Sequence, residues 1–243
     1  MRAILVSYLL VCATLASGTA HAKEIRIASI NHSMPRLIVT QGIMEQIYQR
    51  LGLTMTLVKY PPKRSLMEAN NGAVHGELAR ASAIEANNPN LIRVPYSIGT
   101  VKLMAIQSKH QPEIEHLAEL KDLRIGLLRG FKTAENMTQN LQREMYNDIS
   151  GLFKGLLYNR IDVAIFTQIG GEHYLRENQL EDKLAISKQA LIEIPIYHYL
   201  HNRSKPTAET LIKEMQKMHT SGELKSLIEA QEQSFIIGSQ NRY

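Results

Sequence analysis

Arg80 is the residue of this sequence with the clearest potential for solute chemistry. It lies just beyond a predicted strand over residues 73–78, and ligands of open α/β sheets bind at the carboxyl ends of the strands. A guanidinium group there can hold a carboxylate through two parallel hydrogen bonds. The same side chain could instead pair with Glu77, three residues earlier. The sequence leaves both interpretations of Arg80 open.

The same positional rule selects further residues behind the other predicted strands. Gly130 opens a predicted helix, and the free amide groups and positive dipole end of a helix favour an anion. Thr133, in the first turn of that helix, is a candidate for a ligand contact or for a simple N-cap. The predicted ligand-binding residues are Asn31, Tyr60, Arg64, Glu77, Arg80, Ser82, Arg129, Gly130, Thr133 and Thr167.

No catalytic or metal-binding motif accompanies these residues. The sequence after Ala22 contains no nucleophile elbow, phosphate-binding loop, dinucleotide-binding glycine motif or zinc-protease motif. His198 and His201 lie three residues apart on a predicted strand, which directs them to opposite faces. The single cysteine, Cys12, lies in the N-terminal apolar segment. We therefore expect no catalytic residue, no metal, no cofactor and no enzymatic activity.

The N-terminal residues have the composition of a secretory signal peptide. Arg2 precedes an apolar run over residues 3–16, and the cleavage pattern Ala20-His21-Ala22 follows. The run is shorter than the roughly 20 residues that a membrane-spanning helix needs. An uncleaved anchor is the alternative. We expect cleavage after Ala22, so that residues 1–22 are the signal peptide and the mature protein is periplasmic.

Length and charge limit the remaining classes of protein. The formal net charge of the 243 residues is +5, and the basic residues are scattered rather than gathered in blocks. Scattered charge is typical of a solvated surface, so no nucleic-acid partner is expected. The length suits one large domain or two small lobes.

Strands and helices alternate along the chain in two successive blocks. Strand–helix–strand alternation of this kind predicts parallel sheets and an α/β fold class. The predicted elements are strands at 24–29, 53–60 and 73–78 with helices at 35–51 and 65–70, then strands at 123–128 and 161–166 with a helix at 133–146.

Two apolar strands are predicted to cross between these blocks, at residues 101–107 and 192–200, and helices at 207–219 and 222–231 follow. Two crossings predict two lobes joined by a two-strand hinge. The expected boundaries are 23–103 with 196–243 for lobe 1, and 104–195 for lobe 2.

Four segments resemble the motifs of one protein family. Residues 117–130 are similar to its L-x-x-L-K-G-K-x-V-G-V-x-x-G motif, 71–76 and 159–164 to its paired G-x-I-D-A strands, and 220–227 to its D-G-T-x-x-K-L motif. The chain thus resembles the family 3 solute-binding proteins of amino-acid-type ABC importers. The resemblance implies the type II periplasmic binding protein fold and a cleft between two lobes that captures a small polar solute for an ABC permease.

The resemblance also bears on the solute. Arg64 is similar to the arginine of the family's P-x-x-R-A-L stretch. Amino-acid binders of the family carry an arginine a few residues beyond the third strand, but residues 84–88 here contain none. They commonly hold the ligand ammonium with an aspartate where this chain has Thr167. Because a buried ammonium without a counter-charge is costly, we expect an anionic solute rather than a standard α-amino acid.

Two other functions share this fold. One is a ligand-sensing protein whose closed form docks on a membrane sensor, and the other is a periplasmic dehydratase that acts on cyclic acids. We expect a monomer with a small-molecule ligand in each case.

Overall fold

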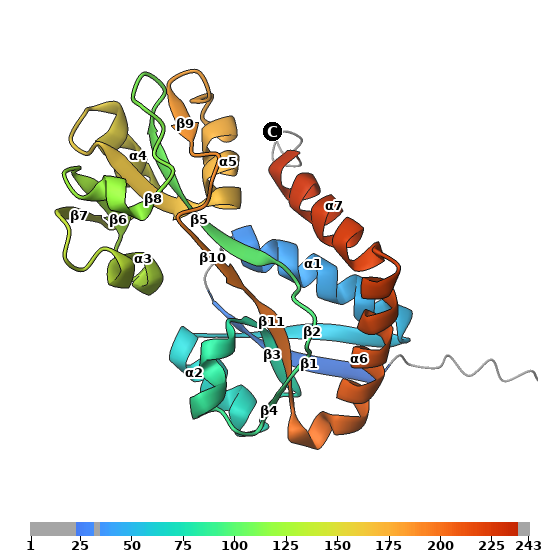
Figure 1. Ribbon diagram of the computed structural model, residues 1–243. Helices are drawn as coiled ribbons and strands as arrows, with labels where there is room; N and C mark the ends of the chain where they lie inside the picture. The colour runs from blue at the N-terminus through green and yellow to red at the C-terminus, as the bar shows by residue number, and fades with distance from the viewer. Residues whose placement is uncertain (1–22, 32–34, 238–243) are drawn as a thin grey trace, which may run out of the picture.

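The computed structural model describes residues 23–31 and 35–237, which are arranged around two separate β-sheets (Figure 1). The predicted signal peptide and its cleavage site lie outside the described residues. None of the helices in the described ranges is both long and apolar enough to cross a membrane.

The first lobe is built on a five-stranded sheet of order β2-β1-β3-β11-β4. β1 pairs in parallel with β2 and β3, whereas β11 runs antiparallel between β3 and β4. Its elements are β1 (Lys23–Ile30), α1 (Pro35–Arg50), β2 (Leu53–Tyr60), α2 (Pro62–Asn70), β3 (Gly76–Arg80), η1 (Ser82–Asn87), β4 (Leu91–Arg93), β11 (Tyr197–His201), η3 (Asn202–Ser204), α6 (Lys205–Thr220) and α7 (Glu223–Ile237).

The second lobe is built on a six-stranded sheet in which β10-β5-β8-β6-β7 are neighbours and β9 also pairs with β5. β6 is parallel to β7 and β8, and β5 is antiparallel to β8. Its elements are β5 (Thr100–Ser108), η2 (Leu117–Leu120), β6 (Ile125–Leu128), α3 (Lys132–Met137), β7 (Arg143–Tyr146), α4 (Ile149–Leu157), β8 (Val163–Thr167), α5 (Gln168–Glu177), β9 (Leu184–Ile186) and β10 (Ile192–Pro195).

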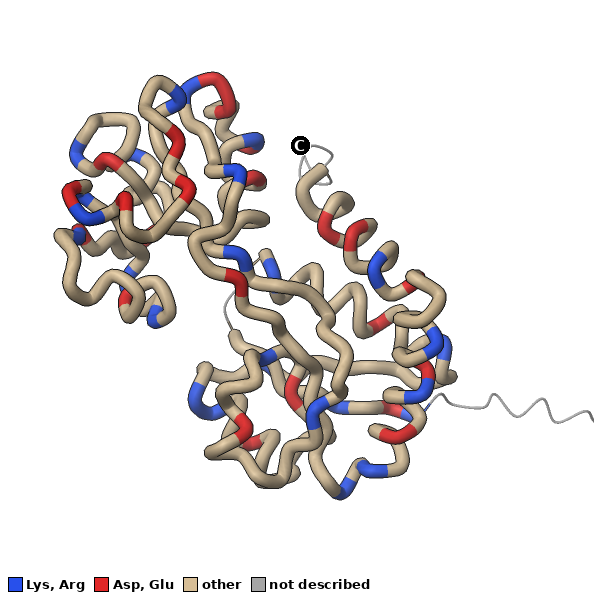
Figure 2. The backbone as a smooth tube through the Cα atoms, viewed as in Figure 1, with Lys and Arg blue, Asp and Glu red and all other residues tan. Residues whose placement is uncertain are grey.

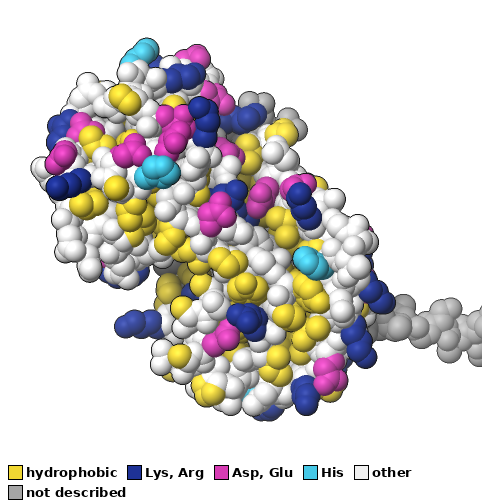
Figure 3. Space-filling view, in the orientation of Figure 1, with side chains coloured by type: hydrophobic (Ala, Val, Ile, Leu, Met, Phe, Trp, Pro, Cys, Tyr) yellow, Lys and Arg dark blue, Asp and Glu magenta, His cyan; other side chains and the backbone are white. Residues whose placement is uncertain are grey.

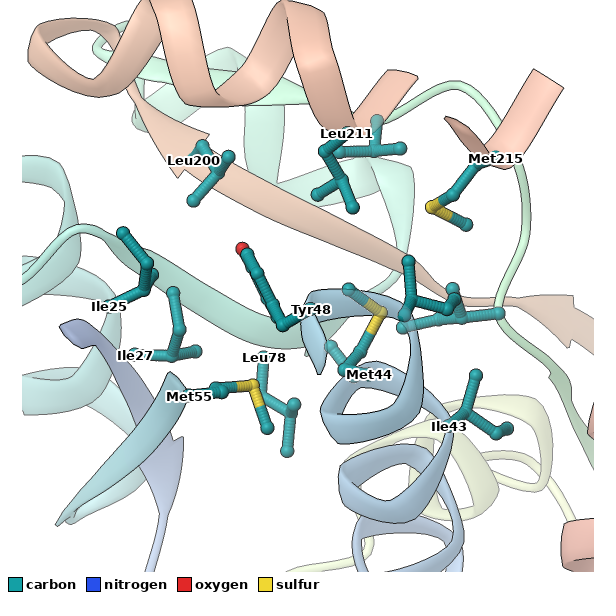
Figure 4. Packing of buried hydrophobic residues seen from close by; sticks show 14 of the residues in the cluster. Ile25, Ile27, Ile43, Met44, Tyr48, Met55, Leu78, Leu200, Leu211 and Met215 are labelled. Carbon is teal, nitrogen blue, oxygen red and sulfur yellow. The ribbon is translucent and has the colours of Figure 1, made fainter. Parts of the chain in front are cut away.

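Apolar side chains fill both faces of each sheet. In the first lobe, Ile25, Ile27 and Leu78 from the strands meet Tyr48 of α1 and Leu211 of α6, all completely buried (Figure 4). In the second lobe, α3 covers one face and α4 and α5 cover the other. Each lobe therefore has its own hydrophobic core, which fixes the strand ends within that lobe.

The two lobes are joined by chain segments that include β5 and β10, here called the connecting strands. They pair antiparallel with each other (Figure 1). The segment 94–99 leads from β4 to β5, and Ile196 separates β10 from β11. The expected boundary at 103/104 falls inside β5, and the one at 195/196 falls between β10 and β11. The boundaries themselves remain a proposal.

The helix predicted over 133–146 is wrong beyond Met137. α3 ends there, and Arg143–Tyr146 is the strand β7, which pairs with β6. Tyr146 lies against Gly126 of β6 and Gly155 of α4. Pairing at the sheet edge and packing of this ring outweigh the local helical pattern, which is a weak preference.

Four predicted strands are shifted or divided, and one of them, expected at 123–128, begins at Ile125. The strand expected at 73–78 begins only at Gly76 and runs to Arg80, because residues 71–75 form a turn. The strand expected at 161–166 runs from Val163 to Thr167. The segment 192–200 is two strands in different sheets rather than one. Strands β4, β7 and β9 and helices α4 and α5 were not predicted.

Candidate solute-binding site

The carboxyl ends of the parallel strands place the predicted site residues in each lobe. β1, β2 and β3 end at Ile30, Tyr60 and Arg80 in the first lobe, and β6 and β8 end at Leu128 and Thr167 in the second. In Figure 1, α2 and α3 lie on the same side of the molecule, one in each lobe. The surface is indented between the lobes on that side (Figure 3).

Glu77 and Arg80 form an ion pair at the end of β3. Arg80 Nε donates to Glu77 Oε1 over 2.8 Å, and Ser65 Oγ donates to Glu77 Oε2 over 2.6 Å. The Glu77 carboxylate is 1% exposed and the Arg80 side chain 14%. Burial raises the pKa of Glu77, although Arg80 and Ser65 oppose the shift. The structural pairing left open by the sequence is therefore present.

This ion pair does not use the whole guanidinium group. Arg80 Nη2 has only a long hydrogen bond of 3.3 Å to the carbonyl oxygen of Pro62, and Nη1 has no hydrogen-bond partner among the described residues. Arg80 can therefore pair with Glu77 and still donate to a solute. Glu77 offsets its positive charge, which weakens the attraction for an anion.

The other predicted residues of the first lobe surround the ends of β1 and β2. The backbone N–H of Asn31 donates to the Tyr60 carbonyl oxygen over 2.8 Å and joins the two strand ends. The Arg64 guanidinium carbon lies 5.5 Å from the Tyr60 ring centroid, within cation–π range. Arg64 also pairs with Glu68 at 3.1 Å and is 61% exposed. Ser82 is exposed at the start of η1.

In the second lobe, the predicted anion position at Gly130 holds a carboxylate of the chain itself. The Gly130 N–H donates to Glu135 Oε1 over 2.6 Å. Hydrogen bonds from Lys132 and from this N–H lower the pKa of Glu135. α3 has six residues only. A solute anion would have to displace Glu135, so the helix start is less available than the sequence implies. Arg129 is exposed and donates to Asn147 over 3.2 Å.

The two predicted threonines differ in what they do. Thr167 caps α5, accepting a hydrogen bond of 3.3 Å from the Gly170 N–H. Thr133 is the second residue of α3 and does not cap it, because Phe131 is at the cap position. Both threonines are partly exposed. The N-cap interpretation of Thr133 is therefore wrong.

Sequence reasoning missed the contribution of β11. Tyr197 lies opposite Arg80 in the antiparallel pair of β11 and β3, and the guanidinium carbon of Arg93 lies 4.8 Å from the Tyr197 ring centroid. The Tyr199 hydroxyl donates to Glu85 over 3.0 Å. Nothing local in the sequence places β11 between β3 and β4. The only available signal was the second crossing between the lobes.

The described residues contain no cluster of three or more histidine, cysteine, aspartate or glutamate side chains that could hold a metal ion. His198 is fully buried between Tyr48 and the Leu78 carbonyl oxygen. His201 accepts a hydrogen bond from the Arg203 N–H. Both histidines thus have structural partners.

Comparisons with other proteins give few sequence relatives. The chain matches no protein-family model. It is 24% identical to an uncharacterized protein of Shewanella oneidensis over 200 residues. The aligned region covers 80% of this chain and 74% of that protein.

Solved structures are more informative about the fold. An amino acid ABC transporter substrate-binding protein of Streptococcus pneumoniae, bound to L-arginine, matches 88% of this chain and 96% of its own, with a TM-score of 0.62 and 17% identity. The GluR0 ligand-binding core in complex with L-glutamate matches 88% of this chain and 99% of its own length, with a TM-score of 0.67 and 11% identity. The periplasmic VFT2 domain of Bordetella pertussis BvgS matches 85% of this chain and 92% of its own length, with a TM-score of 0.59 and 14% identity. This chain has the type II periplasmic binding protein fold, as its resemblance to family 3 solute-binding proteins implies.

Proposed function

We propose that this protein is a solute-binding protein that holds a small polar molecule between its two lobes without changing it chemically. The observation that carries the proposal is the position of Arg80, a largely buried cation at the carboxyl end of β3 whose Nη1 has no hydrogen-bond partner within residues 23–31 and 35–237. Strand ends of this kind are where open α/β sheets bind ligands. Similar structures bound to L-arginine and L-glutamate support the same use of the fold.

The finer proposal is that the solute carries an anionic group held by Arg80. The planar guanidinium group suits a carboxylate. Thr167, which caps α5 through its hydroxyl, brings no negative charge to meet an ammonium group. The proposed ligand-contacting set is the one predicted from sequence. It comprises Asn31, Tyr60, Arg64, Glu77, Arg80 and Ser82 in the first lobe and Arg129, Gly130, Thr133 and Thr167 in the second.

The proposed setting is the periplasm, with an ABC-type permease as the partner that receives the solute. A membrane sensor is the second candidate, because similar structures include the GluR0 core and the BvgS domain as well as transporter proteins. N-terminal sequencing of the exported protein tests the setting. The proposal expects Lys23 as the first residue.

A thermal-shift screen of amino acids, organic acids, polyamines and sugars tests the proposed function. A solute at 100 times its Kd should stabilise the protein by about 2.7 kcal/mol, which raises Tm by several degrees. The absence of any hit across these classes would count against solute binding.

Calorimetric titration of two variants tests the anionic group. Arg80→Lys keeps a positive partner for Glu77 but loses the planar fork, so an acidic hit should bind about tenfold more weakly or worse. Arg50→Lys is the matched control, because Arg50 pairs with Glu223 on the exposed surface of the same lobe. If hits are neutral or cationic only, or if Arg80→Lys binds as tightly as the parent, the anionic proposal fails while solute binding stands.

A further inference from the structure

A cavity of about 550 Å³ lies beside the connecting strands. None of the ten residues predicted to bind the solute lines it. Its walls come from β5, β10, the first turns of α5 and the segment that follows β9. The lining residues that matter here are Lys102, Met104, Gln168, Glu172, Ser187 and Glu193.

A cation, Lys102, and a carboxylate, Glu193, line this cavity from the connecting strands. Lys102 of β5 and Glu193 of β10 lie opposite each other in the antiparallel register, with Nζ and Oε1 3.6 Å apart. Basic and acidic positions on the connecting strands are visible in Figure 2. The two side chains are 41% and 57% exposed, and an exposed pair of this kind contributes little to stability. Lys102 can therefore exchange Glu193 for another carboxylate at little cost.

Glu172 of α5 supplies a carboxylate that lacks a counter-charge. It accepts one hydrogen bond of 2.8 Å from Gln168, one turn earlier, and has no ion-pair partner in the described part of the chain. The nearby Lys188 is already paired with Glu113 at 2.8 Å. A half-buried carboxylate with a single amide donor favours a cationic group.

The geometry points to a second binding site in this cavity, for a small dipolar molecule whose ammonium group meets Glu172 and whose carboxylate meets Lys102. Ser187 and Gln168 add neutral hydrogen-bonding groups to the cavity wall. The volume lies in the range of small-molecule sites. A molecule with one charge would satisfy only one side of this arrangement. None of the ten predicted solute contacts belongs to this second site, which therefore goes beyond the proposed function.

Methyl NMR of the full mature protein labelled at its methionines tests the site. Met104 lines the cavity and is 3% exposed, whereas Met67 on α2 is 52% exposed and distant from it. The probes are ω-amino acids of increasing length, from glycine to 6-aminohexanoate, each compared with the carboxylate and the amine of matching chain length. At least one ω-amino acid should shift the Met104 methyl signal saturably. Its single-charge analogues should bind about tenfold more weakly or worse.

Two variants separate the proposed contacts from general effects. Glu172→Gln removes the carboxylate and should weaken the ω-amino acid about tenfold or more. Glu177→Gln, on the same helix but outside the cavity, should leave the affinity unchanged. An unchanged Met67 signal and far-UV circular dichroism spectrum verify the fold of each variant. The site is refuted if no probe shifts Met104 saturably, if a single-charge analogue binds as well, or if Glu172→Gln binds like the parent.

Discussion

Glu77 has the most buried carboxylate among the ion pairs of the described residues. Its partner Arg80 supplies the counter-charge that offsets the free-energy cost of burying this carboxylate. Arg80→Met would leave that carboxylate without a counter-charge, which costs about 3–5 kcal/mol of unfolding free energy. Urea denaturation at neutral pH measures the loss. Arg50→Met is the matched control and should cost at most about 1 kcal/mol, because its pair with Glu223 is exposed. Equal losses in the two variants would contradict the assigned role of Arg80.

His198 predicts a pH dependence of stability. Its Nδ1 lies 3.0 Å from the Leu78 carbonyl oxygen and its Nε2 lies 2.8 Å from the Tyr48 hydroxyl. Burial favours the neutral ring, in which Nδ1 donates to the carbonyl oxygen and Nε2 accepts from the hydroxyl. Complete burial lowers the pKa of His198 to about 4 from the ordinary 6.5. The unfolded chain therefore takes up a proton below pH 6.5 that the folded protein resists, and stability falls as pH decreases toward 4.

The size of this effect is about 3 kcal/mol over that pH window. His198→Gln should flatten the dependence, because an amide can make similar hydrogen bonds without titrating between pH 4 and 6.5. Chemical denaturation at several pH values measures it, with the exposed His110→Gln as the control. A His198→Gln profile as steep as that of the parent would show that other groups carry the acid sensitivity.

At the scale of single residues, the sequence predicts Arg80 just beyond a strand and leaves its pairing with Glu77 open, whereas the structure has Arg80 as the last residue of β3 and paired with Glu77. Position relative to a strand follows from local pattern, whereas the binding of the Glu77 carboxylate by both Arg80 and Ser65 depends on how α2 packs against β3. The hydrogen bond from the Gly130 N–H to the Glu135 carboxylate was also not predicted, because a five-residue separation in sequence does not show that the Glu135 side chain reaches back to an amide that precedes α3. The roles of the ten predicted residues in binding remain proposals.

At the scale of elements, the packing of β6 against α4 predicts that Gly126 is intolerant of a side chain. A methyl group there would lie 2.2 Å from Ile161 Cδ1 and 2.8 Å from Leu152 Cδ1, both in the core. Gly126→Ala should therefore lower the unfolding free energy by about 1–3 kcal/mol.

Gly151 on α4 provides the control for this prediction. A methyl group there would meet its nearest neighbours at 3.4 Å, and alanine favours the helix by up to about 1 kcal/mol relative to glycine. Thermal and urea unfolding should thus show Gly126→Ala clearly less stable than Gly151→Ala. The reverse order would contradict the packing described between β6 and α4.

The alternation of strands and helices was predictable where apolar periodicity is strong, as over α1 and β2. The prediction was wrong over 133–146, where the local pattern is helical but Arg143–Tyr146 forms a strand at the sheet edge beside β6. It also failed at Ile196, because one continuous apolar run serves two sheets. Both errors arise where long-range pairing, which a single sequence does not display, decides the local structure.

At the scale of the whole molecule, the lobes meet at more than the connecting strands. α5 of the second lobe packs against α1 and α7 of the first, and the His173 ring centroid lies 4.8 Å from that of Phe235. In Figure 1 the end of α7 approaches α5. A rotation of one lobe against the other would change these contacts, so the open and closed forms would differ there as well as at the solute cleft.

The central claim is that the protein closes its two lobes around a solute, and small-angle scattering tests it most directly. A ligand that touches both lobes stabilises the closed form by its greater affinity for that form. When a tight solute found by the thermal-shift screen saturates the protein, the radius of gyration should decrease. If that solute is acidic, the Arg80→Lys variant should need a higher solute concentration than the parent protein for the same decrease. An unchanged radius of gyration at proven saturation would contradict closure around the solute.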